Sequence, residues 1–321
     1  MKKKITISPP VAAVLLAIVL FVFSGFLPNS FGADLDAAAG QAVNIIRLSV
    51  FLGIIAAGQT LVIISGSEGI DLSAGSVVTL SAILTWTIVQ GQNGRVIPAL
   101  IVVLIVGALI GLINGAGIIF LKISPFVMTL GMAGVITGIV IIANHGNAQG
   151  MLAPIMTRVI ARPLIFGIPG AIIIYIFFAA LMWLILERST FGKQLFAIGV
   201  NRVTTRLSGV NVTSMVLMTY ALAGALAAFG GFMVVGNTGV VFLNLGAPFL
   251  FPSIAAVAVG GTLLSGGKGS YFGTMAGALV LILITSLLTT MQMKDAVRQM
   301  VLGATLLLLI SIYGRQRGFR Q

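Results

Sequence analysis

Long intervals without a single charged residue make up most of this sequence. Charged residues are 7% of the 321 positions and apolar residues are 59%, whereas roughly 25% of an ordinary soluble domain is charged. A soluble chain could not cover its surface with so few charges, which excludes soluble enzymes and disordered tails. The net charge of +12 does not indicate nucleic-acid binding, because the basic residues are not clustered on a polar face. The sequence therefore predicts a polytopic membrane protein.

The lengths of these intervals predict the number of spans. A helix that crosses the ~30 Å hydrocarbon core needs about 20 apolar residues, whereas barrel strands alternate in character over only about 10 residues. We therefore expect an all-α integral membrane protein, a single transmembrane domain over residues 1–321 with about ten transmembrane helices. The predicted spans are residues 5–33, 48–67, 72–94, 96–121, 123–144, 163–186, two within 207–267 separated near 236–246, 269–293 and 296–314.

The basic residues predict the orientation of the chain. Placing Met1 on the cytoplasmic side puts most of the 18 lysines and arginines inside, as expected because positive loops resist translocation. We therefore expect both termini in the cytoplasm. The basic start before residues 9–26 could also be a secretory signal, but its apolar core is long and no small-x-small cleavage pattern follows. A retained first helix is the expectation.

A polar, glycine-rich break separates the second and third predicted spans. Residues 65–76 contain two of the six acids, Glu68 and Asp71. Backbone groups at membrane depth must be satisfied, so an irregular segment there packs against protein or lines a wet cavity. Two interpretations stay open: a tight cytoplasmic turn in which Asp71 or Ser73 caps the third helix, or a broken helix that lines a substrate path. Together with two amides inside predicted spans, the candidate residues of such a path are Gln59, Glu68, Gly69, Asp71, Ser73 and Asn114.

The longest predicted cytoplasmic loop, residues 187–212, is basic and amphipathic. Within it, Phe191, Leu195 and Ile198 fall at helical spacing. Short amphipathic pieces of this kind could lie on an anionic membrane surface, or they could dock into a cleft of a cytoplasmic partner. Glycines divide the loop into pieces, which favours docking with a specific shape.

A second glycine-rich stretch, residues 260–273, invites comparison with a phosphate-binding loop. Gly261 and Gly266 have the right interval, but Gly-Lys-Gly follows instead of Lys-Ser or Lys-Thr, and no strand precedes them. We therefore expect no nucleotide site on this chain, and interpret the stretch as a tight turn whose small residues let two helices approach closely. With one histidine and no cysteine, no metal site and no catalytic set are expected, so the chain is not expected to be an enzyme.

Several motifs together resemble one family. They are Gly69-Ile-Asp-Leu-Ser-Ala-Gly-Ser76, Ser124-Pro-Phe-Val-Met-Thr-Leu-Gly-Met132 and the stretches 190–201, 206–211 and 260–269. In this order, and over nearly the whole chain, they are similar to the permease subunits of bacterial ribose-type ABC sugar importers. The same superfamily includes permeases for branched-chain amino acids, nucleosides and the autoinducer-2 signal.

The resemblance implies a subunit of the bacterial inner membrane with a type II-like fold, in which two helix bundles have opposed orientations. It implies a dimer with a second permease copy or paralogue, a periplasmic substrate-binding protein, and cytoplasmic ABC ATPase subunits that carry ATP and Mg, with no cofactor on this chain. The matching segment that couples to the ATPase would contain Gly192, Lys193, Gly199, Asn201, Arg206, Ser208 and Gly209. Charges on outside loops that would dock the binding protein are Asp34, Asp36, Arg158 and Arg162.

Two departures from the family pattern bear on the substrate. Ser67-Glu68 is inserted ahead of Gly69, and Pro248-Phe-Leu-Phe-Pro252 stands where ribose-type relatives often carry Glu-Leu-Asp. We therefore expect a monosaccharide, but not ribose in particular. The alternatives are another small solute of the same superfamily, a secondary transporter that uses Glu68 or Asp71 to couple protons or sodium, and an inert membrane scaffold.

Overall fold

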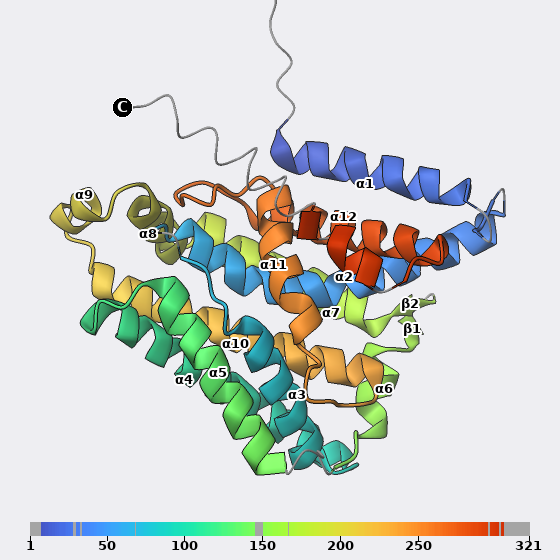
Figure 1. The fold of residues 1–321 in the computed structure, drawn as a ribbon, viewed down its shortest axis with the longest axis horizontal. Coiled ribbons are helices and arrows are strands. Elements are labelled where there is room, and N and C mark those ends of the chain that lie inside the picture. Colours follow the sequence, from blue (N-terminus) through green and yellow to red (C-terminus); the bar gives the residue numbers. More distant parts are fainter. Residues whose placement is uncertain are drawn as a thin grey trace, which may run out of the picture.

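A computed structural model describes residues 8–27, 30–32, 34–67, 69–144, 150–165, 167–294, 296–301 and 303–304. Over these residues the chain is mostly helical, with one short antiparallel hairpin (Figure 1). The elements are α1 (Pro9–Gly25), α2 (Leu35–Ile64), α3 (Ala74–Val89), η1 (Asn93–Arg95), α4 (Val96–Phe120), α5 (Pro125–Asn144), α6 (Pro154–Ile160), β1 (Pro163–Ile165), β2 (Ile168–Pro169), α7 (Gly170–Trp183), the π turn η2 (Leu184–Arg188), α8 (Thr190–Val200), α9 (Arg202–Leu207), α10 (Val212–Thr238), α11 (Ala247–Val259) and α12 (Tyr271–Thr290).

Six helices among the described residues are long and apolar enough to cross a membrane. They are α2, the η1–α4 stretch, α5, the α7–η2 stretch, α10 and α12. Three shorter apolar helices, α1, α3 and α11, occupy three further predicted spans. The last predicted span, residues 296–314, lies largely outside the described residues. The structure agrees with an all-α membrane protein, and the count of about ten spans stays a prediction.

The second helix is longer than the predicted span. α2 begins at Leu35 instead of near residue 48, and its 30 residues extend about 45 Å at about 1.5 Å per residue, against a hydrocarbon core of ~30 Å. Asp34 caps this helix, since its Oδ1 accepts the N–H groups of Asp36 (2.9 Å) and Ala37 (3.1 Å). The apolar interval therefore marks the part that can lie in the bilayer, while the capped helix continues beyond it.

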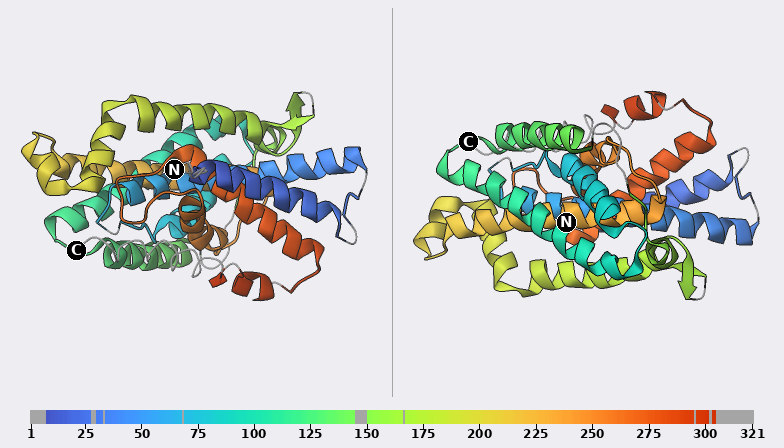
Figure 2. Two further views of the ribbon diagram at one scale, coloured as in Figure 1. Left: turned by 90° about the horizontal axis from the view of Figure 1, so that it is seen from above. Right: turned by 90° about the horizontal axis from the view of Figure 1, so that it is seen from below.

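α10 lies at the centre of the fold, packed against α2, α3 and α4. Its contact with α4 is tight because glycines remove side chains from it. A Cβ atom at Gly111 would overlap the Tyr220 carbonyl group, and one at Gly224 would overlap the Gly107 carbonyl group. Small residues of this kind let membrane helices approach to backbone contact. α5 and α7 lie on opposite flanks of this core (Figure 2), and α1 packs along α12.

The predicted close approach around residues 260–273 is present. A Cβ atom at Gly260 would overlap the backbone of Gly273, and one at Gly277 would overlap the carbonyl oxygen of Ala256. α11 and α12 therefore pack backbone against backbone, as the small residues of this stretch indicate.

α3 and α11 are short helices that each follow a long helix through an irregular segment. α2 leads through residues 65–73 into α3, and α10 leads through residues 239–246 into α11. The break after α10 falls where the sequence predicts it. α2 and α10 run in opposite directions across the molecule (Figure 1). The order Ile70-Asp-Leu-Ser-Ala74 in the first segment corresponds to Leu243-Asn-Leu-Gly-Ala247 in the second.

The two short helices meet near their first residues. The Gly246 N–H donates to Thr79 Oγ1 at 2.9 Å, and a Cβ atom at Gly246 would overlap the Gly75 carbonyl oxygen. The irregular segments thus bring the starts of α3 and α11 into direct contact inside the bundle.

Candidate functional site

The α2–α3 segment, residues 65–73, folds back along the end of α2. Gln59 lies more than a turn before the last residue of α2, yet its Nε2 donates to the Asp71 carbonyl oxygen (2.6 Å) and its Oε1 accepts the Asp71 N–H (3.2 Å). Both residues are buried. One side-chain amide therefore satisfies both backbone groups of a residue outside any helix, as an apolar environment requires. The segment therefore joins α2 to α3 through an irregular stretch whose buried backbone is satisfied inside the protein, which is compatible with both interpretations left open by the sequence.

Thr129 of α5 holds the same segment from a second helix. Its Oγ1 accepts the Leu72 N–H at 3.0 Å, and its hydroxyl has the carbonyl oxygens of Pro125 (2.9 Å) and Ile70 (3.3 Å) as acceptors. Thr129 is not among the site residues predicted from the sequence. The available signal was a hydroxyl four residues after a proline in a mostly apolar span, which marks a group that needs a partner inside the protein.

The carboxylate of Asp71 starts a chain of buried side-chain hydrogen bonds. Its Oδ1 accepts the N–H of Ser73 (2.9 Å) and the hydroxyl of Ser73 (2.5 Å), and Ser73 Oγ accepts from Asn114 Nδ2 of α4 (3.0 Å). Ser73 stands at the N-cap position of α3, but its side chain accepts no helix N–H. The predicted cap by Ser73 is therefore wrong, because its hydroxyl already bonds to Asp71 and Asn114. Asp71 accepts the backbone N–H of Ser73, the residue directly before the first residue of α3.

The described path candidates are thus gathered in one place, at the start of α3. Gln59, Asp71, Ser73 and Asn114 are each at most 2% exposed, and Gly69 is buried beside them. Glu68 lies outside the described residues. Their observed contacts hold the α2–α3 segment against α2 and α4, so a role in lining a substrate path stays a prediction. Accessible hydroxyls occur nearby on Ser76 of α3 and Thr137 of α5, whose oxygens are 3.4 Å apart.

The loop predicted over residues 187–212 folds into two short helices at one end of the molecule (Figure 1). Ser189 begins α8, its Oγ accepting the Gly192 N–H (3.1 Å). Asn201 begins α9, its Oδ1 accepting the Thr204 N–H (3.0 Å). Leu195 and Ile198 are buried against the bundle, which confirms the helical pattern read from the sequence.

The coupling candidates predicted from the sequence lie on α8, on α9 and directly after α9. Gly192 is buried, and a Cβ atom there would overlap the Leu186 carbonyl oxygen. Burial lowers the pKa of the Arg202 guanidinium at the start of α9, although arginine keeps its charge in proteins. Between the helices lies an open groove of about 690 Å³. Lys193, Asn201, Arg206, Ser208 and Gly209 are exposed, and the groove is lined by Lys193, Ala197, Val200, Asn201, Thr204 and Ser208, among others.

The four charges predicted to dock a partner lie on the start of α2, on α6 and just before β1, elements on the far side of the molecule from α8 and α9 (Figure 1). Asp34 and Asp36 are exposed at the start of α2, Arg158 is exposed on α6, and Arg162 is exposed before β1. The middle of α2 contacts the end of α6, since Arg47 Nη1 donates to the Ala161 carbonyl oxygen (3.3 Å). A shared docking role for the four charges stays a prediction.

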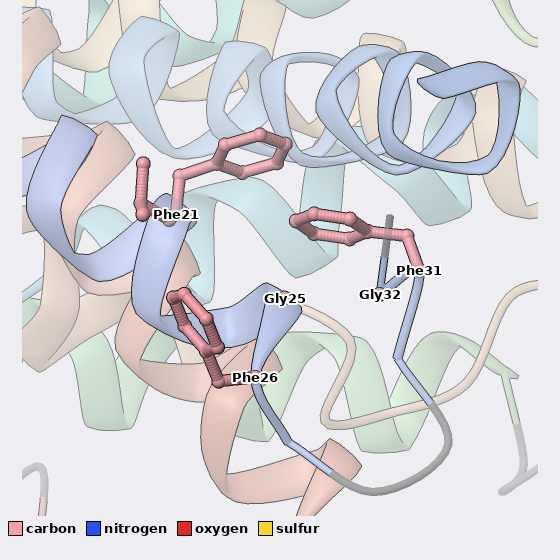
Figure 3. A pocket seen from close by; sticks show the side chains of 6 residues that line it. Phe21, Gly25, Phe26, Phe31 and Gly32 are labelled. Atoms are coloured by element: carbon pink, nitrogen blue, oxygen red, sulfur yellow. The ribbon is translucent and has the colours of Figure 1, made fainter. Parts of the chain in front are cut away.

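An apolar pocket of about 410 Å³ lies beside the end of α1. Figure 3 shows the rings that form it, with Phe21 and Phe31 stacked at a centroid distance of 5.2 Å. Its lining consists of Phe21, Val22, Gly25, Phe26, Phe31 and Gly32. These side chains offer no hydrogen bond to a polar solute, so the pocket is not a candidate binding site for one.

Residues 41–310 match the model of a family described as "Branched-chain amino acid transport system / permease component". The chain belongs to this permease family. Among its relatives, the galactose/methyl galactoside import permease of Escherichia coli (strain K12) is 32% identical over 94% of this chain and 91% of the relative. The fructose import permease of Bifidobacterium longum is 32% identical over 88% and 80%, and the ribose import permease of Escherichia coli (strain K12) is 29% identical over 94% and 92%. No solved structure matches the chain.

Membership of the permease family confirms the resemblance drawn from the motifs. The relatives named above are import permeases for sugars, and the match extends over most of each chain. With its six long apolar helices among the described residues, the chain is a multi-pass membrane permease of the inner membrane.

Proposed function

We propose that this chain is the transmembrane subunit of an ATP-driven importer that moves a monosaccharide from a periplasmic binding protein into the cytoplasm. The observation that carries the proposal is the α8–α9 pair, which presents an open groove at one end of a permease whose sequence has no nucleotide-binding loop. A permease with no energy source of its own needs a partner that supplies it. The identity of about 30% with sugar import permeases over most of the chain supports a sugar as the solute.

The two ends of the molecule suit two different partners. Cytoplasmic ABC ATPase subunits, which carry ATP and Mg, would dock at the α8–α9 groove, where Lys193 and Arg206 supply positive charge. The periplasmic binding protein would dock at the opposite end, through Asp34, Asp36 and Arg158. In this proposal the N- and C-termini lie in the cytoplasm and no cofactor is bound to this chain. A second permease copy or paralogue would complete the complex.

The fold class that we propose is a single transmembrane domain with two opposed helix bundles, as in type II-like importers. Its support is the repeated order of a long helix, an irregular segment and a short helix, in α2–α3 and again in α10–α11. The long members run in opposite directions. Transporters built from inverted repeats commonly place substrate near such broken helices.

The sugar path that we propose passes the start of α3. The buried Gln59, Asp71 and Asn114 would shape this path by fixing the α2–α3 segment, while the accessible hydroxyls of Ser76 and Thr137 would face the sugar. Neutral hydroxyls suit a neutral solute, since each can donate and accept a hydrogen bond. The Asp71 carboxylate would take part in fixing the α2–α3 segment, since it accepts two hydrogen bonds from Ser73.

Reconstitution tests this proposal. The complex is purified from native membranes through a tag on this chain, its partners are identified, and it is placed in proteoliposomes with labelled galactose, fructose or ribose. Uptake that requires ATP and the binding protein is the expected result. Uptake driven by a proton or sodium gradient, with no ATPase in the complex, would contradict it and favour a secondary transporter.

A further inference from the structure

Four glycines from three separate segments meet where α8 contacts the end of α2. We call this contact the glycine junction. Its members are Gly66, at the start of the α2–α3 segment, Gly199, in the last turn of α8, and Gly266 with Gly267, in the loop that joins α11 to α12. In the sequence these glycines lie in three separate motifs.

The junction is a contact of backbone against backbone. A Cβ atom at Gly199 would overlap both the Ile64 carbonyl oxygen and the Gly267 nitrogen. A Cβ atom at Gly266 would overlap the Cα atom of Gly66, and one at Gly66 would lie 3.0 Å from the Cα atom of Gly199. The Gly267 N–H donates to the Ile64 carbonyl oxygen at 2.9 Å, so a hydrogen bond also joins the α11–α12 loop to the end of α2.

The four glycines are required for different reasons. Gly66, Gly266 and Gly267 have φ angles of 74°, 87° and 74°, a region that L side chains rarely adopt. Gly199 lies within helix α8, so only the lack of space excludes a side chain there. A substitution at Gly199 therefore tests the contact itself, without backbone strain.

The junction connects the partner groove with the buried polar cluster. On one side, Ala197 and Val200 of the same α8 turn line the groove, together with Asn201, which follows them. On the other side, Gly66 lies in the segment that leads through Asp71 to α3, which begins at Ala74. The α11–α12 loop contacts both Gly199 and Gly66 and leads into α12.

We propose that the glycine junction transmits the movement of α8 to the start of α3 and to the α11–α12 loop, with Gly199 as the positioning residue. The inference rests on the proposed function, since it assumes an ATPase docked at the α8–α9 groove. A contact without side chains has no rotamers that can absorb a displacement, and packed interiors transmit strain. A small shift of α8 therefore moves the α2–α3 segment directly.

The test compares two alanine variants of the junction with a matched control in the intact importer. Gly199→Ala inserts a methyl group into the junction without backbone strain, and Gly66→Ala adds a methyl group 3.0 Å from Gly199 together with the strain of a φ angle of 74°. Gly40→Ala is the control, since no atom lies within 4 Å of a Cβ atom at that helical position. The measured quantity is uptake per ATP hydrolysed, for whichever of labelled galactose, fructose and ribose the wild-type complex imports.

A second readout follows the movement itself. The chain has no cysteine, so Ser76→Cys provides a single thiol on α3. Its rate of modification by a thiol reagent is measured with and without a non-hydrolysable ATP analogue. A merely structural defect lowers the amount of complex, but it does not abolish the nucleotide dependence of this rate in the complex that remains.

We expect Gly199→Ala to retain ATP hydrolysis, to lower uptake per ATP by about tenfold, the size of a typical coupling between sites, and to remove the nucleotide dependence at Ser76→Cys. Gly66→Ala lowers the same ratio as well, and Gly40→Ala leaves it unchanged. If the importer with Gly199→Ala does not assemble, uptake per ATP and thiol reactivity of the Gly66→Ala importer test the junction instead.

Wild-type uptake per ATP and wild-type thiol reactivity in both junction variants would overturn the junction alone. A wild-type complex without ATP-dependent uptake would overturn the proposed function, and the junction with it.

Discussion

The bond between the Gln59 side chain and the Asp71 backbone can be removed by one substitution, Gln59→Leu. Leucine has a similar length but neither donates nor accepts a hydrogen bond. The Asp71 carbonyl oxygen then loses its donor at 2.6 Å, and the Asp71 N–H loses its acceptor at 3.2 Å. Gln59 is 1% exposed and Asp71 is 2% exposed, so bulk water does not reach either group.

The number of buried polar groups left without a partner sets the expected loss of stability. A buried polar group left without a partner costs about 1–3 kcal/mol, and two such groups together cost on the order of 2–6 kcal/mol. For a chain of this length a loss of 1 kcal/mol lowers the melting temperature by roughly 2 °C, so we expect a fall of about 5 °C or more. The assay is thermal unfolding of the purified permease in detergent, followed by size-exclusion chromatography.

The matched control is Gln41→Leu in the same helix. Gln41 is half-exposed near the projecting start of α2, so the same change of side chain there leaves no buried group unpaired. Equal melting temperatures for Gln59→Leu and Gln41→Leu would refute the reasoning, because the amide would then contribute nothing to holding the α2–α3 segment.

Three further predictions follow from other contacts. Thr129→Val leaves the Leu72 N–H without its acceptor and costs about 1–3 kcal/mol; Thr129→Ser restores the melting temperature, and an unstable serine variant would contradict the assignment. Asp34→Ala removes the cap of α2 and costs about 1 kcal/mol, seen as faster amide exchange at Asp36 and Ala37, while the amount of copurified ATPase stays constant. Arg206→Glu reverses an exposed charge on α9, and we expect less copurified ATPase at an unchanged melting temperature; full retention of the ATPase would argue against docking at this helix.

The apolar helices that the structure describes coincide with apolar intervals of the sequence, because such intervals mark the parts of a chain that can leave water. The break between α10 and α11 was predicted from its glycines, and the helical pattern of Leu195 and Ile198 from their spacing. The residue at which α2 begins could not be predicted in this way. Hydropathy marks which residues can lie in the hydrocarbon core, whereas Asp34 and its hydrogen bonds determine where the helix begins.

The candidate site was only partly predictable. Gln59, Asp71, Ser73 and Asn114 stood out as polar groups in apolar surroundings, and the structure gathers them at the start of α3. Their partners did not stand out. Thr129 is 57 residues from Leu72, and no sequence pattern around either residue predicts their hydrogen bond.

Composition and the order of motifs by themselves determined a membrane permease with a glycine-rich break after its second span, because both are properties of neighbouring residues. The tertiary structure decided that this break folds back along α2, and that Gly66, Gly199 and Gly267 meet at one point. The reason is physical: backbone groups buried away from water must find partners, and here those partners lie on helices far apart in the chain. Only the packed fold determines which ones they are.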